Sequence, residues 1–235
     1  MAKTKQEKYK QKNIKYYDTV RKSIVRKPIA YLLGVPVTIF YRVSFEGIEN
    51  IPDKPFFLMA NHRSMLDLIS VQYKLPRWVH WIAKRSLFEI PVVGWFIRQL
   101  GAIPLEREQK DPATVRAVLK LAREGYSIGI FPQGTRVKDQ DLDKVLPHGN
   151  AANLAARAKL PIVPMVFAEP WKIFGKQRVI IGEPFYMPEP QDKQNRKEAY
   201  NQIMLDIMRG VFQLADIDWN PELDVCSEND ENREH

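Results

Sequence analysis

The sequence has little of what several classes of protein require. Its 235 residues include a single cysteine, Cys226, which excludes an intramolecular disulfide and suits a reducing compartment. The uncharged run from Pro28 to Tyr41 is shorter than the ~20 apolar residues of a spanning helix. We expect Pro36 to interrupt that run. We also expect no metal site, because no Cys/His cluster has the spacing of ligands.

Charge divides the chain into three parts. Residues 1–42 contain eleven Lys and Arg against two acidic residues, a net charge of +9, whereas residues 215–235 have a net charge of −7. The body between them holds the remaining +6 of the total of +8. We therefore expect a basic arm over 1–42, one folded domain over 43–214 and an acidic, mobile tail over 215–235.

The basic arm is typical of binding to nucleic acid or to an anionic membrane surface. Ile14, Tyr17 and Ile24 recur at helical spacing among basic residues, which favours an amphipathic helix on a membrane, and we expect no nucleic acid partner. The run from Pro28 to Tyr41 fits the same arm or, alternatively, a core helix followed by a strand. We do not expect a signal peptide, because the stretch before this run is too long and no clear cleavage site follows.

Short hydrophobic runs alternate with helical patterns along the body. Asp111-Pro112, for example, is an N-cap followed by proline in the first turn, and Gly125 suits the residue after that helix. Such alternation predicts an α/β fold with a largely parallel central sheet flanked by helices. We expect an edge strand in 43–50, further strands at 56–60, 80–83, 102–105, 127–131, 160–167 and 178–181, and helices at 64–73, 91–100, 111–124, 149–159 and 197–212.

The strand at 56–60 runs directly into a cluster of polar residues. Open α/β sheets bind ligands at the carboxyl ends of their strands, so a site is expected here. His62 and Asp67 lie five positions apart, a rotation of about 140° on a helix, and meet only if His62 precedes the helix and Asp67 lies in its first turn. Ser64 as N-cap would place them so. The alternative is a plain Ser-x-x-Asp capping box beside a loop histidine.

A histidine backed by a carboxylate can act as a general base, because the carboxylate orients the ring and stabilises its protonated form. We expect no nucleophile from the chain itself, since its cysteine lies in the acidic tail and no serine is expected at a nucleophile elbow. Such a base would activate a hydroxyl group on a bound substrate. Cations near other strand ends, at Lys84-Arg85 and at Arg136 beside Gly134, indicate a phosphate site.

Four stretches, in order, resemble the glycerolipid acyltransferases, and among them the 1-acylglycerol-3-phosphate (lysophosphatidate) acyltransferases. They are Asn-His-x4-Asp from Asn61, the segment from Lys84 to Arg107, Phe-Pro-Gln-Gly-Thr-Arg from Phe131, and Leu-Pro-Ile-Val-Pro-Met from Leu160. The resemblance implies that His62 is the base and Asp67 its orienting partner. It also assigns a phosphate site to Lys84, Arg107 and Arg136, and a substrate-binding loop to Gln133, Gly134 and Thr135.

The implied reaction transfers a fatty acyl group from a thioester, on coenzyme A or acyl carrier protein, to the sn-2 hydroxyl of 1-acyl-glycerol 3-phosphate. Phosphatidic acid and a free thiol leave, no cofactor is needed, and backbone N–H groups after His62 stabilise the oxyanion. The implied partners are membrane lipids, including an anionic leaflet, and the implied location is the cytoplasmic face of the cell membrane. Acceptors such as glycerol 3-phosphate or another lysolipid, and a non-catalytic membrane-binding role, remain alternatives.

Two positions depart from the family pattern. Gln133 stands where the family usually has glutamate, so a charge is lost while hydrogen bonding is retained. The segment Leu146-Pro-His-Gly149 replaces a more commonly aromatic and basic one. His148 is therefore a second histidine to consider, and we expect its role to be structural.

Overall fold

The structure, a computed structural model, describes residues 26–106, 111–192 and 194–221. These residues form a seven-stranded sheet in the order β1-β7-β6-β2-β5-β3-β4. Strands β6, β2, β5, β3 and β4 are mutually parallel, and β7 pairs antiparallel with β6 and parallel with β1. The predicted α/β class with a largely parallel sheet is confirmed. The strands are β1 (Val43–Glu46), β2 (Phe57–Ala60), β3 (Val79–Lys84), β4 (Ile103–Leu105), β5 (Ser127–Ile130), β6 (Ile162–Phe167) and β7 (Gln177–Ile181).

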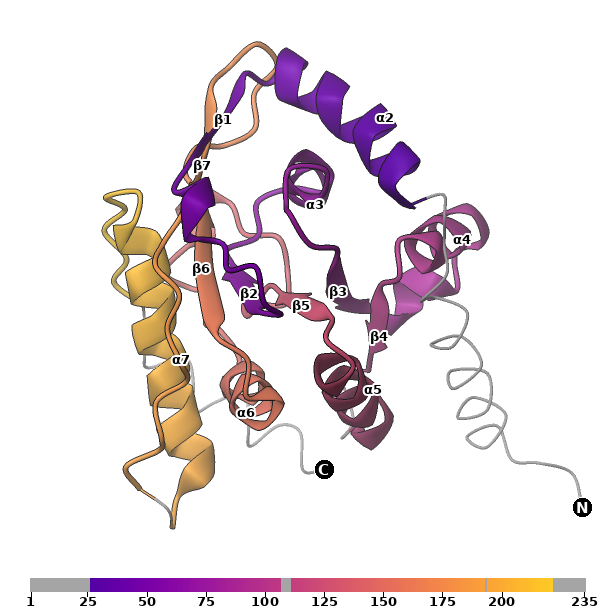
Figure 1. The fold of residues 1–235 in the computed structure, drawn as a ribbon. Coiled ribbons are helices and arrows are strands. Elements are labelled where there is room, and N and C mark those ends of the chain that lie inside the picture. Colours follow the sequence, from indigo (N-terminus) through magenta and orange to yellow (C-terminus); the bar gives the residue numbers. More distant parts are fainter. Residues whose placement is uncertain (1–25, 107–110, 193, 222–235) are drawn as a thin grey trace, which may run out of the picture.

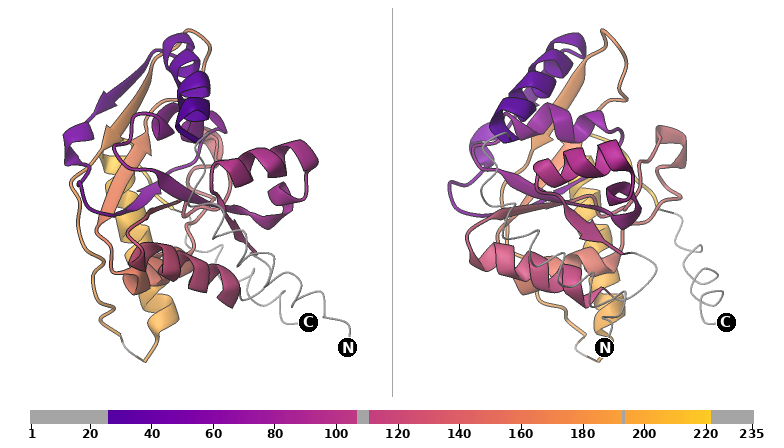
Figure 2. Two further views of the ribbon diagram at one scale, coloured as in Figure 1. Left: turned by 45° about the vertical axis from the view of Figure 1, so that its right-hand side comes forward. Right: turned by 90° about the vertical axis from the view of Figure 1, so that its right-hand side faces the viewer.

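Helices cover both faces of the sheet (Figures 1 and 2). On one side lie α3 (Leu66–Gln72) and α4 (Pro91–Gln99), with α2 (Arg26–Phe40) packed against α3. On the other side lie α5 (Pro112–Arg123), α6 (Gly149–Ala158) and α7 (Arg196–Gln213). The central strands are therefore hydrophobic on both faces, as parallel strands under two layers of helices must be.

Side chains of β2 show this double burial. Phe57 and Met59 belong to the core shared with α5, α6 and α7, whereas Leu58 and Ala60 belong to the core on the side of α3. All four residues of the strand are buried. Alternation along the strand thus sends successive side chains into two separate cores.

The predicted elements are found within a few residues of their expected bounds, except in the run from Pro28 to Tyr41. This run lies in a single helix, α2, which continues through Pro36, so the expectation that the proline interrupts it is wrong. Proline removes the bond to the carbonyl four residues earlier, that of Leu32. Leu32 is 73% exposed, so this carbonyl lies on the side of the helix that water reaches.

Helix α2 approaches α3 closely at Gly34. A Cβ atom at this position would lie 2.3 Å from Cδ1 of Tyr73 and 2.8 Å from the carbonyl oxygen of Ile69. Within the described residues, no helix is long and apolar enough to span a membrane. Residues 1–25 of the expected arm and residues 222–235 of the expected tail lie outside the described residues.

Candidate active site

The parallel strands end at one edge of the sheet, and the loops that follow them gather there. Strand β2 lies between β5 and β6. The loop that begins at Asn61 after β2 therefore neighbours the loops after Ile130 and Phe167. Residues more than 100 positions apart become neighbours, at the edge where α/β sheets usually bind ligands.

His62 and Asp67 are in direct contact at this edge. Nδ1 of His62 lies 2.7 Å from Oδ2 of Asp67. The Asp67 side chain is fully buried, whereas that of His62 keeps 13% of its surface exposed. His62 precedes α3 and Asp67 lies in its first turn, as the five-residue offset requires. With Nδ1 donating to the carboxylate, Nε2 is the ring nitrogen left to accept a proton.

The start of α3 differs in detail from the predicted N-cap at Ser64. The helix begins at Leu66, and Oγ of Ser64 accepts the Leu66 N–H at 3.2 Å, a local turn two residues long. Asp67 instead reaches back and accepts the Ser64 N–H at 2.9 Å. Only the acidic half of the predicted capping box is therefore present.

Asp67 accepts hydrogen bonds from four donors. Besides the His62 ring, the N–H groups of Arg63 and Ser64 donate to Oδ2 at 2.7 and 2.9 Å, and Nε1 of Trp171 donates to Oδ1 at 2.6 Å. Such bonds compensate a buried carboxylate for the loss of water. The N–H groups of Arg63 and Ser64 are thereby used, so the expectation that they stabilise an oxyanion is wrong for these two groups.

Two aromatic rings form a stack against one face of the His62 ring. The imidazole stacks on Phe131 with centroids 3.9 Å apart and planes 13° apart, and Phe131 stacks on Trp81 at 4.7 Å. The indole N–H of Trp81 donates to Oε1 of Gln72 at 3.0 Å, which anchors the base of the stack to α3. The imidazole is thus held at one face by stacking and at Nδ1 by Asp67.

Two further polar residues join the loop after β2 to the end of β6. The Asn61 side chain donates to the Phe167 carbonyl at 3.1 Å and accepts the Phe167 N–H at 2.8 Å. Arg63 donates through Nε to the same carbonyl at 2.7 Å and forms an ion pair with Asp139. These contacts fix the backbone on either side of His62.

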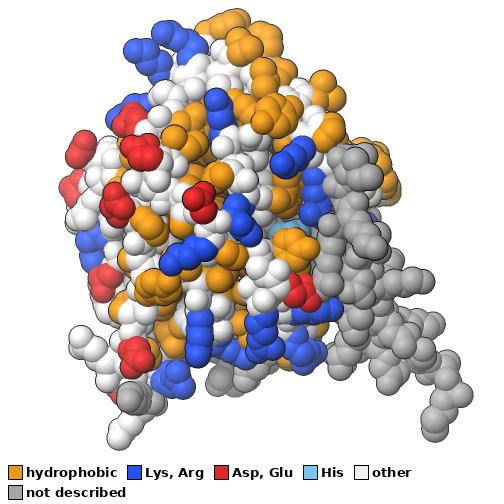
Figure 3. All heavy atoms as spheres, in the orientation of Figure 1, with side chains coloured by type: hydrophobic (Ala, Val, Ile, Leu, Met, Phe, Trp, Pro, Cys, Tyr) orange, Lys and Arg blue, Asp and Glu red, His pale blue; other side chains and the backbone are white. Residues whose placement is uncertain are grey.

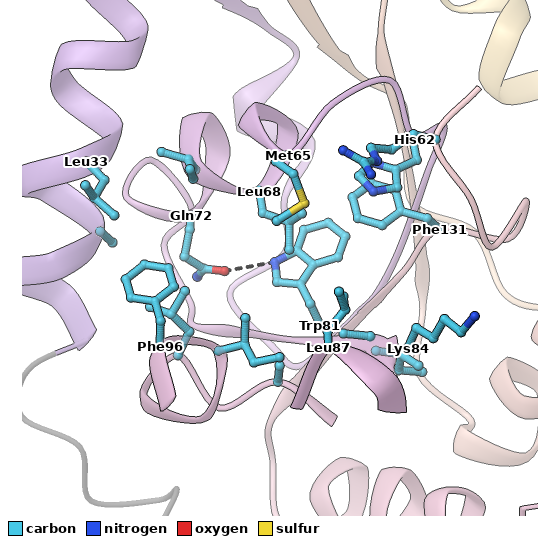
Figure 4. A pocket seen from close by; sticks show the side chains of 18 of the residues that line it. Leu33, His62, Met65, Leu68, Gln72, Trp81, Lys84, Leu87, Phe96 and Phe131 are labelled. Carbon is cyan, nitrogen blue, oxygen red and sulfur yellow. Dashed lines mark hydrogen bonds between the residues drawn. The ribbon is translucent and has the colours of Figure 1, made fainter. Parts of the chain in front are cut away.

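A cavity of about 270 Å³ extends from His62 between α2, α3, α4 and β3 (Figure 4). His62 and Phe131 lie at one end, and Leu33 and Phe96 lie toward the other. Most of the remaining lining side chains are apolar, among them Ile29, Leu68, Ile82, Leu87, Ile97 and Leu100. A slot of this kind suits a ligand with a hydrocarbon chain whose reacting end meets the histidine.

Two predicted cations and part of the predicted loop line the same cavity. Lys84, Gly134, Thr135 and Arg136 all lie on its wall. The Lys84 and Arg136 side chains are exposed, and neither forms an ion pair or hydrogen bond with another residue that the structure describes. They are available to an anionic ligand. Arg107, the third predicted cation, lies outside the described residues.

The Gln133 side chain does not line the cavity, unlike Gly134 and Thr135 of the predicted substrate-binding loop. The side chain is buried, with 2% exposed, and its Nε2 donates to the Val145 carbonyl at 3.2 Å. Oε1 has no hydrogen-bond partner among the described residues. The chain turns sharply at Gly134, where φ is +71°, so Gln133 points inward while Thr135 reaches the cavity.

Two other residues have structural positions. His148 occupies the N-cap position of α6, where its backbone N–H donates to the Pro132 carbonyl at 2.9 Å. Ser127 lies in a Gly-x-Ser-x-Gly pattern at 125–129, which sequence reasoning overlooked. It begins β5, is buried, and accepts the Phe56 N–H at 3.3 Å, so it is not at the strand-to-helix turn of a nucleophile elbow.

Several residues of the site were not expected from the sequence. Trp171, Phe131, Trp81 and Arg63 hold the two predicted side chains in place, and Ile29 and Leu33 of α2 close the cavity. Position offered a signal for Phe131 and Trp171, since both follow the end of a buried strand as Asn61 does. The contacts of the remaining side chains carry no local pattern in the sequence.

The comparisons with known proteins decide the family. The family model described as Acyltransferase matches residues 42–168. A 1-acyl-sn-glycerol-3-phosphate acyltransferase of Bacillus subtilis is 32% identical over 179 residues, which cover 71% of this chain and 88% of that protein. This chain belongs to the acyltransferase family. The matched segment contains the His62–Asp67 pair but ends before Trp171.

Two other proteins also resemble this chain, one in sequence and one in fold. A chloroplast 1-acyl-sn-glycerol-3-phosphate acyltransferase of Brassica napus is 33% identical over 169 residues, 65% of this chain, and the chain spans about half of that relative, 48%. The crystal structure of the 1-acyl-sn-glycerophosphate acyltransferase PlsC from Thermotoga maritima has the same fold, with a TM-score of 0.53. It covers 86% of this chain and 88% of its own, at 22% identity.

Proposed function

We propose that the chain is a 1-acyl-sn-glycerol-3-phosphate acyltransferase, which acylates the sn-2 hydroxyl of its acceptor and yields phosphatidic acid for phospholipid synthesis. The observation that carries this proposal is the 2.7 Å contact between Nδ1 of His62 and Oδ2 of Asp67 at the end of an apolar cavity. Relatives that bear this activity in their names support the choice of acceptor.

In the proposed reaction Nε2 of His62 takes the hydroxyl proton while the oxygen attacks the carbonyl carbon of an acyl thioester. The bond from this carbon to sulfur then breaks, and the thiolate leaves with the proton. Asp67 stabilises the protonated ring, as carboxylates do behind catalytic histidines. The four donors to Asp67 and the stack of His62 on Phe131 keep both side chains in place.

The two substrates use different parts of the site in this proposal. Lys84 and Arg136 bind the acceptor phosphate through charge-assisted hydrogen bonds, with Gly134 and Thr135 beside them. The apolar walls from Leu68 toward Leu33 and Phe96 receive an acyl chain. Either coenzyme A or acyl carrier protein serves as carrier of the acyl group. No metal or redox cofactor is needed, because the His62–Asp67 pair supplies the base and the thioester is already activated.

The proposed acceptor and product are lipids, so the enzyme is proposed to work at the cytoplasmic face of the membrane. The charge of +9 over residues 1–42 attracts this arm to an anionic leaflet, and Ile14, Tyr17 and Ile24 at helical spacing favour a membrane over nucleic acid. The same proposal makes lysophosphatidic acid and the acyl carrier the partners of the enzyme.

The test is an acyl-transfer assay with purified protein. Labelled acyl-CoA and acyl carrier protein are each offered with 1-acyl-glycerol 3-phosphate, glycerol 3-phosphate and a neutral lysolipid. The proposal expects labelled phosphatidic acid from the first acceptor, and His62→Ala serves as the blank. Turnover on another acceptor alone would assign that acceptor instead, and no turnover on any acceptor would leave a membrane-binding role.

A further inference from the structure

The loop between β6 and β7 exposes two large apolar side chains at its tip. Ile173 is 68% and Phe174 is 69% exposed. At the adjoining end of α2, Ile39 is 67% and Phe40 is 54% exposed. Figure 3 shows hydrophobic side chains gathered along this upper edge of the molecule, over α2 and the loop beside it. Isolated apolar side chains are common on surfaces, whereas a contiguous group needs an explanation.

The loop and the helix form one surface. The Phe174 N–H donates to the Phe40 carbonyl at 2.9 Å, and the two rings meet edge to face with centroids 6.3 Å apart. We call this surface the apolar tip and define it as Ile39, Phe40, Ile173 and Phe174. It continues along the exposed side of α2 through Val35 and Leu32.

Phe174 adopts a backbone conformation that a bulky residue rarely takes. Its φ is +60°, in the left-handed region where glycine or asparagine is favoured. A large aromatic residue in this conformation, with most of its side chain in solvent, does not improve the packing of the free protein. Strain of this kind occurs chiefly where a residue serves function.

Charge indicates which partner covers the apolar tip. Lys172 and Lys176 flank Ile173 and Phe174 in the sequence, both are exposed, and neither forms an ion pair with a described residue. Cations around inserted apolar side chains match the interface of a bilayer with anionic head groups. A protein partner with a charged surface would not accept the apolar side chains.

We propose that the apolar tip, with Lys172 and Lys176, inserts into the surface of an anionic bilayer as a docking site separate from residues 1–25. The choice of a lipid partner rests on the proposed function, in which acceptor and product are lipids. Docking here also places α2, whose inner side chains Ile29 and Leu33 line the cavity, next to the lipid.

Vesicle flotation tests the docking site without any measurement of turnover. The full chain is compared with Ile173→Ser/Phe174→Gly on vesicles of phosphatidylcholine with and without phosphatidylglycerol. We expect the partition coefficient of the variant to fall about tenfold or more, since two buried apolar side chains are lost. Phe174→Gly also relieves the positive φ, so the melting temperature should stay or rise.

Two controls make the outcome decisive. Tyr186→Ser removes a side chain that is 61% exposed and lies after β7, away from the apolar tip. The preceding residue, Phe185, pairs with Ile162 at the start of β6, whereas the tip follows the end of that strand. This variant should not change flotation. Lys172→Gln/Lys176→Gln should reduce only the preference for anionic vesicles. Unchanged flotation of the tip variant would overturn the docking site. So would a dimer of the wild-type chain that becomes monomeric in this variant, because a second copy would then cover the tip.

Trp171, two positions before Ile173 of the apolar tip, carries an independent inference. Trp171 donates from Nε1 to Oδ1 of Asp67 at 2.6 Å and packs edge to face against Tyr41, with ring centroids 5.2 Å apart. Among the described residues it is the only donor to Oδ1, while the other three donors of Asp67 all use Oδ2. We infer that Trp171 is a positioning residue, which sets the rotation of the Asp67 carboxylate and through it the His62 ring.

Trp171→Phe tests this role on whichever acceptor supports turnover, so a wrong choice of acceptor does not affect the result. We expect kcat to fall about ten- to a hundredfold, in line with the loss of one hydrogen bond to a charged group, with KM for both substrates within about twofold. The acid limb of the kcat profile against pH should also move, because the environment of the His–Asp pair changes.

Trp219→Phe is the matched control. Its buried indole donates to the Leu142 carbonyl at 3.0 Å, so the variant also loses one hydrogen bond but far from the pair in sequence and core. It should lower the melting temperature without changing kcat per folded molecule. If Trp171→Phe behaves like Trp219→Phe, with unchanged kcat and pH profile, Trp171 is only structural.

Discussion

At the scale of single residues, the site depends on one buried carboxylate. Asp67 receives donors from its own loop, from the His62 ring and from Trp171, 104 positions later. Oδ2 faces the His62 ring and two backbone N–H groups, and Oδ1 faces the indole N–H of Trp171. Substitutions here therefore act on the loop as well as on the base.

We expect His62→Ala to lower kcat by about 10²–10⁴, the usual contribution of a general base, while the fold is retained. Asp67→Asn should lower both turnover and melting temperature, because its NH₂ group must face a donor on one side or the other. Stopped-assay rates and circular dichroism measure the two effects. A folded His62→Ala protein with near-normal turnover would contradict the proposed mechanism.

Lys84 and Arg136 are predicted to act on acceptor binding. Each lines the cavity and is exposed, so removal of either should weaken binding of a phosphorylated acceptor by about 1.5–3 kcal/mol without disturbing the fold. KM for acceptor and for acyl donor is measured in Lys84→Ala and Arg136→Ala. Lys138→Ala, an exposed cation two positions after Arg136 that does not line the cavity, is the control. An acceptor KM equal to that of this control would refute the phosphate site.

Gln133→Glu restores the residue usual in the family but is predicted to destabilise this chain. The side chain is buried against the Val145 carbonyl, and Oε1 has no partner among the described residues. A carboxylate there would lose the donated bond and face a carbonyl oxygen, at a cost of about 1–3 kcal/mol or more. Urea unfolding at neutral pH measures it, and Gln140→Glu on the exposed surface is the control. If the urea midpoint of Gln133→Glu equalled that of the wild type, the buried position of residue 133 would be shown to accept a negative charge.

At the scale of elements, β3 contributes a buried histidine that has no part in the proposed chemistry. His80 has Nδ1 2.8 Å from the Gly101 carbonyl, which joins β3 to the turn before β4. Burial, the largest cause, and the nearby Arg26 lower its pKa from 6.5 to about 4, against the bond to Gly101, which raises it. The Tyr126 ring packs against its edge at 5.2 Å.

This lowered pKa predicts acid sensitivity. Between pH 6.5 and about 4 the unfolded chain binds a proton at His80 that the folded chain does not. As the pH decreases through this window, the free energy of unfolding therefore decreases by about 3 kcal/mol. Urea unfolding at pH 7.5 and 4.5 measures the loss. His80→Gln should lose less than the wild type. Equal losses in the two proteins would assign the acid sensitivity to other groups.

At the scale of the whole molecule, the basic arm and α2 have separable roles. Residues 26–40 pack on α3 at Gly34 and line the cavity, so they belong to the folded body as well as to its apolar surface. Residues 1–25 contain eight of the basic residues of the arm. Their removal and the removal of α2 should therefore have different consequences.

A chain that begins at Arg26 is predicted to keep its melting temperature and to bind anionic vesicles less tightly. Each cation near such a surface contributes about 1 kcal/mol, an attraction that salt screens. A chain that begins at Arg42 should also lose thermal stability, because the surfaces of α3 and the cavity under α2 become exposed. Flotation at two salt concentrations and thermal unfolding distinguish these outcomes. Equal flotation of the full chain and the chain from Arg26 would show that residues 1–25 do not anchor the protein to the membrane.

The sequence by itself determined the class of fold and the residues at its strand ends. Hydrophobic runs and caps such as Asp111-Pro112 predicted the elements, because such signals act within one turn or one strand. The offset of His62 and Asp67 allowed a contact with His62 before the helix and Asp67 in its first turn, and the resemblance to the acyltransferases favoured it over a plain capping box. The sequence also predicted that Lys84 and Arg136 lie near His62, and both line the same cavity because parallel strands share a carboxyl edge.

Only the tertiary structure decided what surrounds these residues. The order β6-β2-β5 brings Trp171 and Phe131 to opposite sides of the His–Asp pair, and strand order leaves no mark on local sequence. Gln133 turned inward because the path of the chain at Gly134 allows it, and Pro36 remained inside α2 because the carbonyl it frees lies on an exposed side of the helix. Packing between distant segments makes each of these choices, so no pattern within one element predicts them.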